Sequence, residues 1–381
     1  AGPWQASPPY SFVGGHNDAA SIPFAGLAEA AVNAMRREGP ALAAYNLGGS
    51  PQGYAPLRNF VCDKLGVRAG TPVDPGEVLI TSGSLQALDL VNDAFLRPGD
   101  TVIVEQATYG GALTRLERLG VSWVGVELDD DGIVPEHLGR LLDGLAADGV
   151  SPRYLYTIPT IQNPTGSVMP LERRQKVLEL VRAAGVPVFE DDCYADLVWR
   201  GERPPTLRAL DDGGGQVVYC GSFSKSIAPS LRVGYIVADA PVIRQLLALK
   251  TDAGTGSMEQ LALAEYAPAN FDGHVEKLMD ALQVKCRAMR DAVARHFPDD
   301  VTVTDPKGGI YVWLTFPEGV DTTALVEPAA AAGIEFNPGA GWSADADWGR
   351  RRLRLCFGHP DVETIETGVA KLAEIYRDST S

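Results

Sequence analysis

One lysine of this chain has the surroundings of a reactive amine. Lys225 follows the apolar run 217–223, lies beside Ser222 and Ser224, and is trailed by Arg232. A lysine just past a buried strand can have its pKa lowered by desolvation and nearby cations, which makes the neutral amine available as a nucleophile. Two hydroxyls and a guanidinium are also what a phosphate dianion needs. The segment predicts a covalent amine site beside an anion site; a surface lysine in a serine-rich loop is the alternative.

A carboxylate and a phenol follow a second apolar run, at 186–191. Glu190, Asp191 and Asp192 stand at its end, and Tyr194 comes three residues after Asp191. Such a carboxylate can hold an aromatic nitrogen in its protonated form while the tyrosine hydrogen-bonds a neighbouring oxygen. A solvated turn after a strand would also be acidic, but the tyrosine favours a functional pair of Asp191 and Tyr194.

Two further segments supply an anion-binding turn and an aromatic face. Gly83 permits close backbone approach, and Ser84 with Leu85 begins a predicted helix whose free N–H groups and dipole favour an anion. Tyr109 follows the next apolar run and is placed to stack on a planar ring, although a single such tyrosine is more often part of a core. Together the two segments suit a phosphorylated aromatic ring.

Asn163 and Arg354 are candidates for contact with a substrate. Asn163 lies in IPTIQNPTG, where its amide either serves a turn or bridges a cofactor oxygen and a substrate carboxylate. Arg354 lies in the apolar run RLRLCF. An arginine that points inward along such a strand usually has an anionic partner, because burying its charge alone is costly.

These groups are the set that pyridoxal 5′-phosphate (PLP) requires from a protein. The cofactor needs a lysine for its imine, a carboxylate for its pyridine nitrogen, donors for its phosphate and an aromatic face for its ring. An amino acid that reacts with the cofactor also needs a cationic side chain of the protein to bind its α-carboxylate. In an α/β protein we expect such groups at the carboxyl ends of strands. We therefore predict PLP bound through Lys225.

The elements that must position these residues are short apolar runs alternating with amphipathic stretches. This alternation is typical of βα units and predicts an α/β fold, with a mostly parallel sheet covered by helices on both faces. Strands are expected at 78–83, 101–106, 154–159, 186–191, 217–223 and 232–238.

The pattern changes after about residue 272. A long helix is expected over 274–297, then a hairpin over 301–316 and further helix and strand. We predict a large PLP-binding α/β domain over 46–272 and a smaller α+β domain made of 1–45 and 273–381. The first 45 residues join the second domain because so short a segment cannot form a core alone.

Composition narrows the class of protein. The 381 residues carry a net charge of −16, which argues against a nucleic-acid surface because such a surface must neutralise phosphates. Five spread cysteines without CxxC and five histidines without HExxH predict neither a disulfide framework nor a metal site. No apolar run approaches the roughly 18 residues of a membrane span. The first ten residues lack the basic start and apolar stretch of a secretory signal, so we expect a cytoplasmic protein.

The order and spacing of these motifs resemble the class I/II aminotransferases of PLP fold type I, most closely the branch with 2-aminoadipate and multisubstrate aminotransferases. The resemblance covers the chain from about residue 11 and implies a seven-stranded, mostly parallel sheet sandwiched by helices, with a smaller α+β domain. It rests on SFVGG, YNLGGSPQGYAPLR, VLITSGSLQALDL, IPTIQNPTG, FEDDCYADL, GSFSK…LRVGY, PKGGIYVW and RLRLCF.

The resemblance also implies roles for single residues. Lys225 resembles the Schiff-base lysine and proton shuttle, Asp191 the partner of the pyridinium, and Arg354 the clamp of the substrate α-carboxylate. Tyr45 matches a tyrosine that reaches the cofactor phosphate of the neighbouring subunit, which implies a homodimer with shared active sites. The other implied ligands are Tyr194 and Asn163 on the phenolate oxygen, Tyr109 stacked on the ring, and Ser84, Ser222, Ser224 and Arg232 around the phosphate; at Leu85 the chain departs from relatives, which often have a glutamine there.

The substrate side departs from this resemblance. The family's glycine pair, here Gly14 and Gly15, lets the leading segment fold over the substrate, and relatives commonly continue with an apolar, proline-containing stretch. Here positions 16–18 read His-Asn-Asp, and Trp342 lies near the expected mouth of the site. Hydrogen-bonding side chains at that place favour a polar or cationic substrate. A solvated turn before the next helix is the alternative.

Two reactions and one non-enzymatic role are compatible with these motifs. The first reaction moves an amino group from an L-amino acid to a 2-oxo acid. The second starts in the same way but ends in elimination, replacement or carbon–carbon bond formation, as in some fold-type-I enzymes of specialised biosynthesis. The third possibility is a regulatory effector-binding module, which the acidic net charge argues against. We predict the aminotransferase.

Overall fold

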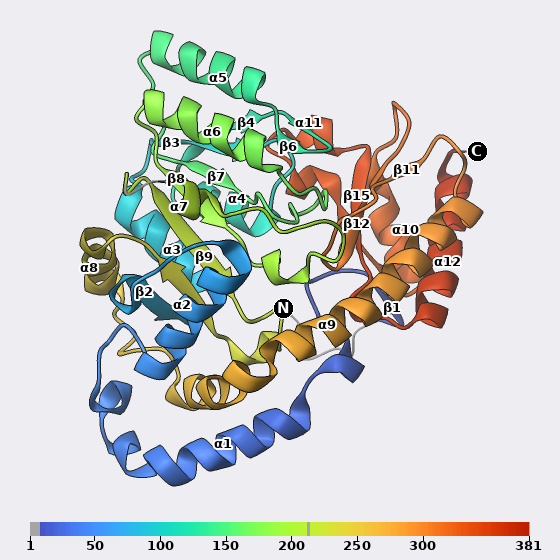
Figure 1. Cartoon of the computed structure of the whole chain (residues 1–381). Helices are drawn as coiled ribbons and strands as arrows, with labels where there is room; N and C mark the ends of the chain where they lie inside the picture. Colours follow the sequence, from blue (N-terminus) through green and yellow to red (C-terminus); the bar gives the residue numbers. More distant parts are fainter. Residues whose placement is uncertain (1–7, 212–213, 381) are drawn as a thin grey trace.

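A seven-stranded sheet lies at the centre of the chain, with helices on both of its sides (Figure 1). The computed structural model describes residues 8–211 and 214–380, so most of the N-terminal decapeptide considered above lies outside the described residues. All neighbouring strands are parallel except β10, which runs against both of its neighbours. The strand order is β2 (Val78–Thr81), β10 (Gly234–Val237), β9 (Val217–Ser222), β8 (Val188–Asp191), β7 (Leu155–Thr157), β3 (Thr101–Glu105) and β4 (Ser122–Val126).

This arrangement confirms the predicted fold class. Each of the six strands expected from the apolar runs is present, and each is shorter than its run by one to three residues because the run continues into the following turn or begins in the preceding one. The seventh strand, β4, was not among the expected runs. Its sequence SWVGV is only partly buried, since β4 lies at the edge of the sheet.

Successive residues of the strands face two separate cores, as the period of a β-strand requires. In β3, Val102 and Val104 pack against the helices on one side, whereas Ile103 packs against those on the other. Strands buried on both faces read as continuous apolar runs, which is the pattern of the sequence. The first side carries α3 (Ser84–Phe95), α4 (Gly110–Arg118) and α8 (Ala240–Leu249); the second carries α5 (Pro135–Ala147), α6 (Leu171–Ala183), α2 (Ala55–Ala69) and α9 (Ser257–His296).

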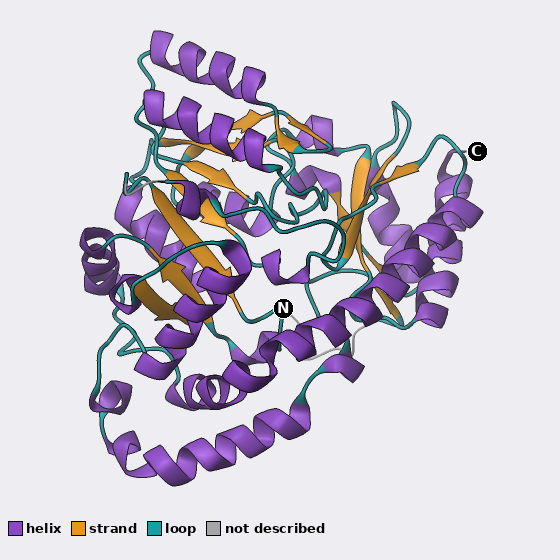
Figure 2. Ribbon diagram, viewed as in Figure 1, coloured by secondary structure: helices purple, strands orange, loops and turns teal. Residues whose placement is uncertain are grey.

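A second, smaller sheet lies beside the first (Figure 2). Its strand order is β11-β12-β15-β14, and the antiparallel pairing of β11 with β12 confirms the predicted hairpin. Near the N-terminus, β1 pairs with β13, so the leading segment joins the C-terminal part of the chain. The elements are β11 (Thr302–Val303), β12 (Tyr311–Thr315), β14 (Asn337–Pro338), β15 (Arg352–Cys356), β1 (Tyr10–Ser11), β13 (Ile334–Glu335), α10 (Val326–Ala331) and α12 (Val362–Thr380).

The long helix differs from its prediction. It was expected to begin at 274, but α9 begins at Ser257 and runs through Pro268, so it crosses the predicted domain boundary without a break. The limits 46–272 therefore stay a prediction. In the described ranges no helix combines the length and apolar character needed to cross a membrane. The remaining elements are α1 (Phe24–Glu38), which packs along α9, and the short β5 (Leu128–Asp129), β6 (Gly132–Ile133), α7 (Leu207–Leu210) and α11 (Ala346–Gly349).

Candidate active site

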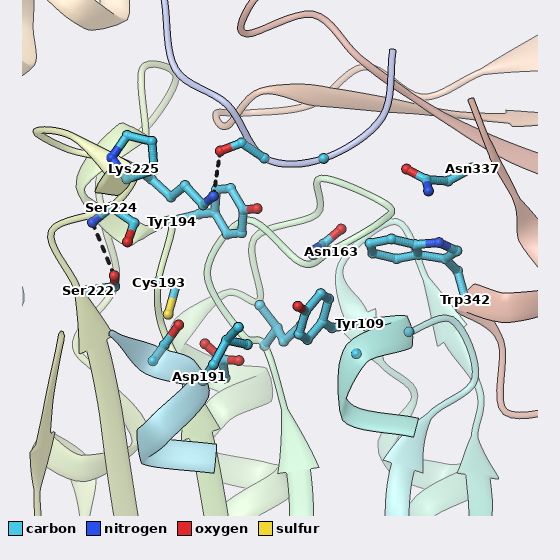
Figure 3. Close-up of a pocket in the computed structure, with 18 of the residues that line it drawn as sticks. Tyr109, Asn163, Asp191, Cys193, Tyr194, Ser222, Ser224, Lys225, Asn337 and Trp342 are labelled. Atoms are coloured by element: carbon cyan, nitrogen blue, oxygen red, sulfur yellow. Dashed lines mark hydrogen bonds between the residues drawn. The ribbon is translucent and has the colours of Figure 1, made fainter. Parts of the chain in front are cut away.

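A pocket of about 640 Å³ opens at the carboxyl edge of the large sheet, where that edge faces the small sheet (Figure 3). The structure brings almost all of the predicted site residues into its wall. Residues 16–18 and Tyr45 are not in the wall, and Tyr45 lies elsewhere, 84% exposed. The predicted residues in the wall are Gly14, Gly15, Ser84, Leu85, Tyr109, Asn163, Asp191, Tyr194, Ser222, Ser224, Lys225, Arg232, Trp342 and Arg354.

The topology of the sheet explains why these residues meet. Ser84, Tyr109 and Asn163 follow the carboxyl ends of β2, β3 and β7, and β8 and β9 end at Asp191 and Ser222. The carboxyl ends of parallel strands share one edge of a sheet, which is where ligands bind in α/β folds. The antiparallel strand β10 begins at this edge instead, which brings the loop before it to the same place.

Lys225 lies in the loop after β9 with its amine inside the pocket. Its Nζ donates to the carbonyl oxygen of Gly15 at 2.5 Å (Figure 3). Burial lowers the pKa of Lys225, and the positive charges of Arg354 and Arg232 act in the same direction. The expected shift toward a neutral amine is therefore present in the fold.

The three acidic residues at the end of β8 have three different environments. Glu190 accepts hydrogen bonds from two backbone N–H groups at the start of α7. Asp192 pairs with Arg203 at 2.9 Å, away from the pocket. Asp191 alone lines the pocket, and its Oδ2 accepts a hydrogen bond of 2.7 Å from the Tyr156 hydroxyl. The acidic cluster is thus not a solvated turn, since all three side chains are buried.

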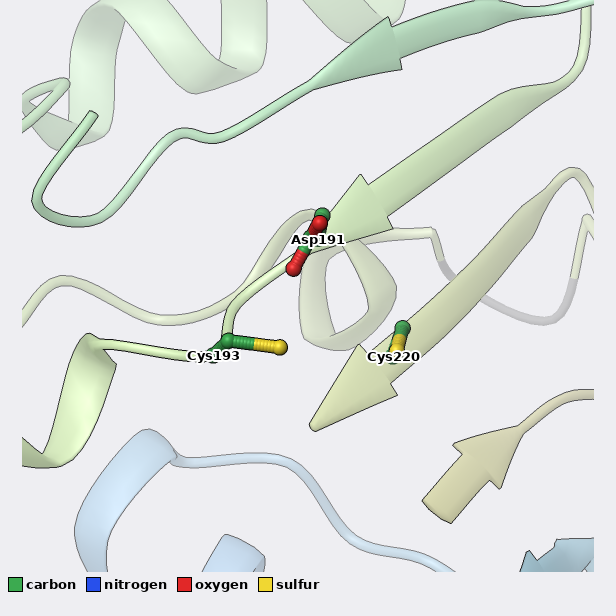
Figure 4. A group of neighbouring side chains, drawn as sticks. All are labelled: Asp191, Cys193 and Cys220. Carbon is green, nitrogen blue, oxygen red and sulfur yellow. The ribbon is translucent and has the colours of Figure 1, made fainter. Parts of the chain in front are cut away.

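Two thiols lie beside Asp191 (Figure 4). The ligand atoms of Asp191, Cys193 and Cys220 lie within 4.8 Å of one another. Contact with Cys220, together with burial, raises the pKa of the Cys193 thiol well above its ordinary value. For Cys220, contact with Cys193 acts downward, but burial and the nearby carboxylates leave its pKa raised. The two thiols pack beside the Asp191 carboxylate, to which the Cys193 thiol donates a hydrogen bond.

A cradle of donors lies between the start of α3 and the Lys225 loop. Gly83 precedes α3 with a φ of 77°, and a Cβ there would collide with the Arg232 guanidinium. Arg232 itself adopts a left-handed φ of 53°, which is uncommon for a side chain of this size. The hydroxyls of Ser84, Ser222 and Ser224 line the same space. Hydroxyls, a guanidinium and a helix N-terminus together fit a phosphate.

Arg354 is a buried cation without an acidic partner among the described residues. Its side chain on β15 is 2% exposed, and it donates to Asn163 Oδ1 at 3.0 Å, the Gly14 carbonyl at 2.7 Å and Asn337 Oδ1 at 2.8 Å. In this part of the chain its Nε–H has no partner. The centroid of the Trp342 ring lies 3.8 Å from the guanidinium carbon. A buried guanidinium with one unpartnered N–H and no acidic partner in this part of the chain fits an anionic ligand such as a carboxylate.

Asn17 and Asp18 do not line the pocket as the polar-substrate hypothesis required, whereas His16 is exposed and lies beside Gly14 of the wall, so its role stays a prediction. Asn17 is buried and donates to the backbone carbonyl of Lys225 at 2.9 Å. Asp18 is also buried and pairs with Lys285 at 2.7 Å. Neither residue lies in the wall, so the structure contradicts direct recognition of a substrate by them. They fix the leading segment and the Lys225 loop instead.

Sequence reasoning missed several residues of the site. Asn337 and Cys193 lie in the wall, and Tyr156 lies directly behind Asp191. Cys193 stands next to a predicted residue in a quoted motif, so its position was a usable signal. Tyr156 alternates along β7 as an ordinary apolar residue, and nothing local marks it. The other wall residues that were not predicted are Gly110, Gly111, Thr114, Ile158, Pro229 and Gly341.

The family match and two relatives named as aminotransferases indicate one family. Other similar relatives are named as transcriptional regulators, such as the uncharacterized HTH-type transcriptional regulator YdfD of Bacillus subtilis, which is 33% identical over 336 residues, 87% of this chain and 67% of the relative. The family described as "Aminotransferase class I and II" matches residues 21–372. A 2-aminoadipate transaminase of Thermus thermophilus is 36% identical over 366 residues, 95% of this chain and 88% of the relative. Aromatic-amino-acid aminotransferase 1 of Thermococcus litoralis is 35% identical over 333 residues, which are 87% of this chain and 79% of the relative. The crystal structure of LysN, an alpha-aminoadipate aminotransferase from Thermus thermophilus complexed with N-(5'-phosphopyridoxyl)-L-leucine, matches with a TM-score of 0.88 at 35% identity, covering 97% of this chain and 92% of LysN.

Proposed function

The chain belongs to the class I and II aminotransferase family, and from this premise we propose the roles of its residues. It is a PLP-dependent enzyme that moves an amino group from an L-amino acid to a 2-oxo acid. The names of its relatives give no support to the alternative of elimination, replacement or carbon–carbon bond formation. The observation that carries the assignment of the site is the convergence of Lys225, Asp191 and Arg354 on one pocket.

The cradle beside α3 would hold the phosphate of PLP. Ser84, Ser222, Ser224, Arg232 and the Leu85 end of α3 line it, and a donor set of this kind fits a dianion. The ring would lie between this cradle and the small sheet. There we assign Asp191 to its pyridine nitrogen, Tyr109 to its face, and Asn163 and Tyr194 to its phenolate oxygen.

Lys225 is the group that we assign to proton transfer. When bound, PLP supplies an electron sink for the bond that breaks at the substrate Cα. The Lys225 Nζ would form the imine bond to PLP and, when free, would accept the proton of the substrate Cα and release it again. A lowered pKa suits this exchange, because the amine must accept a proton near neutral pH and release it again. Asn17 holds the Lys225 backbone in place during the transfer.

Arg354 orients the substrate. Its planar fork matches the two oxygens of an α-carboxylate. The Trp342 ring beside it limits the access of water to the guanidinium, which strengthens the ion pair.

Reduction with borohydride should test the site assignment directly. Treatment of the yellow holoenzyme should fix the cofactor to one peptide, the one that contains Lys225. Lys250 and Lys307 are the competing lysines, but Lys250 pairs with Asp252 at 2.6 Å and Lys307 lies near Asp131 at 3.6 Å, both outside the pocket wall. Fixation on either of them would contradict the assignment. Product identification with a panel of amino acids and 2-oxoglutarate, including 2-aminoadipate and the aromatic amino acids, would define the substrate.

We further infer a homodimer whose subunits share their active sites. Tyr45 is 84% exposed and follows α1, whose outer face presents Phe24, 77% exposed, together with other apolar side chains. Figure 1 shows α1 at the periphery, below α9. Exposed apolar patches of this kind mark interaction surfaces. This supports a second subunit at α1, with Tyr45 directed to the partner's phosphate cradle.

The expected effect of Tyr45→Phe is weaker retention of PLP. Loss of one hydrogen bond to a charged phosphate costs about 1.5–3 kcal/mol, so the Kd for PLP should rise roughly 10- to 150-fold. Equilibrium dialysis would measure it. Tyr54→Phe is the control, since the Tyr54 hydroxyl donates to Glu38 of its own subunit at 3.2 Å. Sedimentation that finds a fully active monomer would refute the shared site.

We also propose a cytoplasmic location. All five cysteines are free, and Cys193 and Cys220 are neighbours that remain unpaired. Neighbouring reduced thiols are typical of a reducing compartment.

A further inference from the structure

Tyr156 is buried behind the pocket and has no direct access to it. It lies on β7, is 2% exposed, and is absent from the pocket wall. Its hydroxyl donates to Asp191 Oδ2 at 2.7 Å. The neighbouring strands β7 and β8 are parallel, so the register that pairs Tyr156 with Phe189 places Asp191 two residues further along. The Tyr156 hydroxyl therefore contacts the Asp191 carboxylate from the interior of the sheet, whereas the carboxylate itself faces the pocket.

Packing of the Tyr156 ring does not explain why this residue carries a hydroxyl group. The Tyr156 ring meets the Phe189 ring edge-on, with 5.6 Å between centroids, and a phenylalanine ring would make the same contact. A buried hydroxyl is costly unless it is hydrogen-bonded. Among the described residues its acceptor is Asp191. The hydroxyl thus acts on the carboxylate rather than on the core.

The surroundings of Asp191 oppose its ionisation. Burial raises its pKa, and the neighbouring carboxylate of Asp192 adds to this, whereas the hydrogen bonds from Tyr156 and Cys193 act in the opposite direction. Glu105, also buried, lies close enough that its charge and that of Asp191 repel each other. The other close groups are the thiols of Cys193 and Cys220. An ionised Asp191 therefore depends on its hydrogen-bond donors.

We propose that Tyr156 is a positioning residue that keeps the Asp191 carboxylate ionised and directed into the pocket, so that the proton shared with the pyridine nitrogen of PLP stays on that nitrogen. The inference rests on the proposed role of Asp191. It adds a residue that touches neither the substrate nor the cofactor. Protonation of the nitrogen is what makes the ring an effective electron sink, so the hydroxyl would act on the reaction through one carboxylate.

The test is the ¹⁵N NMR signal of the pyridine nitrogen in holoenzyme reconstituted with ¹⁵N-labelled PLP. The signal of the wild-type enzyme should lie at the pyridinium position. In Tyr156→Phe the proton should shift toward the carboxylate. Loss of one hydrogen bond to a charged group changes the ratio of the two forms by roughly 10- to 150-fold, so the signal should move measurably toward neutral pyridine.

Tyr154→Phe is the matched control. The Tyr154 hydroxyl is equally buried and donates to Asn92 Oδ1 at 2.7 Å, and its ring also packs on Phe189. This variant loses the same atom from a neighbouring site without touching Asp191. Its nitrogen signal should remain at the wild-type position, whereas an equal movement in both variants would overturn the inference.

Asp191→Asn separates this inference from the proposed function. If Asp191→Asn abolishes the pyridinium signal and Tyr156→Phe leaves it unchanged, Tyr156 has no such role, but the role of Asp191 stands. If Asp191→Asn also leaves the signal unchanged, the role of Asp191 fails and the inference fails with it. Should Tyr156→Phe not fold, 3-fluorotyrosine at position 156 keeps a more acidic hydroxyl; its signal should stay at the pyridinium position, and movement toward neutral pyridine would overturn the inference.

Discussion

Replacement of Lys225 by alanine should reduce turnover by roughly 10⁴-fold, the upper end of what a positioned acid–base group contributes. Two proposed functions would be lost at once, because we assign to the same Nζ both the bond to the cofactor and the transfer of the substrate Cα proton. The fold should survive, since the side chain makes one hydrogen bond, to the Gly15 carbonyl. Single-turnover absorbance changes on mixing with an amino acid would measure the loss, and circular dichroism would report on the fold.

Chemical rescue makes this prediction specific. A small primary amine such as methylamine fits the space left by the lysine side chain and can carry the same proton, so it should restore part of the activity. Lys250→Ala is the control, because Lys250 lies outside the pocket wall and pairs with Asp252. Substantial activity of the Lys225→Ala enzyme without added amine would exclude Lys225 as the proton carrier.

Arg354→Lys should lower kcat/KM for the amino acid substrate while PLP remains bound. Lysine keeps the charge but cannot offer two parallel N–H donors to the α-carboxylate. The loss of one charge-assisted hydrogen bond, about 1.5–3 kcal/mol, corresponds to a decrease of roughly 10- to 150-fold. The guanidinium also satisfies Asn163 and Asn337, so a shorter cation leaves these amides with fewer partners.

The control for this variant lies on the same strand. Arg352 is two residues before Arg354 on β15 but stacks on Trp348 and is not in the pocket wall. Arg352→Lys should leave kcat/KM unchanged. Steady-state kinetics and the Kd for PLP, measured on both variants, separate substrate binding from cofactor binding. If Arg354→Lys kept the wild-type kinetics, the carboxylate clamp would have to lie elsewhere in the pocket.

The cofactor side of the site followed from the sequence because its residues come directly after strands. Asp191 ends β8, Ser222 ends β9 and Ser84 starts α3, so a strand pattern and a residue type were enough to place them. The edge strand β4 was not predicted because it is only partly buried, so its sequence is not a continuous apolar run. The start of α9 was missed because Pro268 lies inside the helix, where proline is disfavoured.

The substrate side could not be predicted in the same way, because it depends on contacts between residues far apart in the sequence. Asp18 looked like a candidate for substrate contact, but it pairs with Lys285 on α9. Asn17 donates to the backbone of Lys225. Tyr156 reads as one more apolar residue of a strand. A local pattern gives the type of a side chain and its face, whereas the partner of a buried polar group is set by the tertiary structure.

The leading segment is held by Lys225 and Arg354, the two groups to which we assign ligand binding. The Gly15 carbonyl accepts from the Lys225 amine, and the Gly14 carbonyl accepts from the Arg354 guanidinium. Any ligand that engages both donors competes with the segment for them. By thermodynamic linkage, the factor by which attachment of the segment changes ligand affinity equals the factor by which the ligand changes attachment of the segment. Through the carbonyls of Gly14 and Gly15, the leading segment would thus weaken ligand binding by the same factor by which the ligand weakens attachment of the segment.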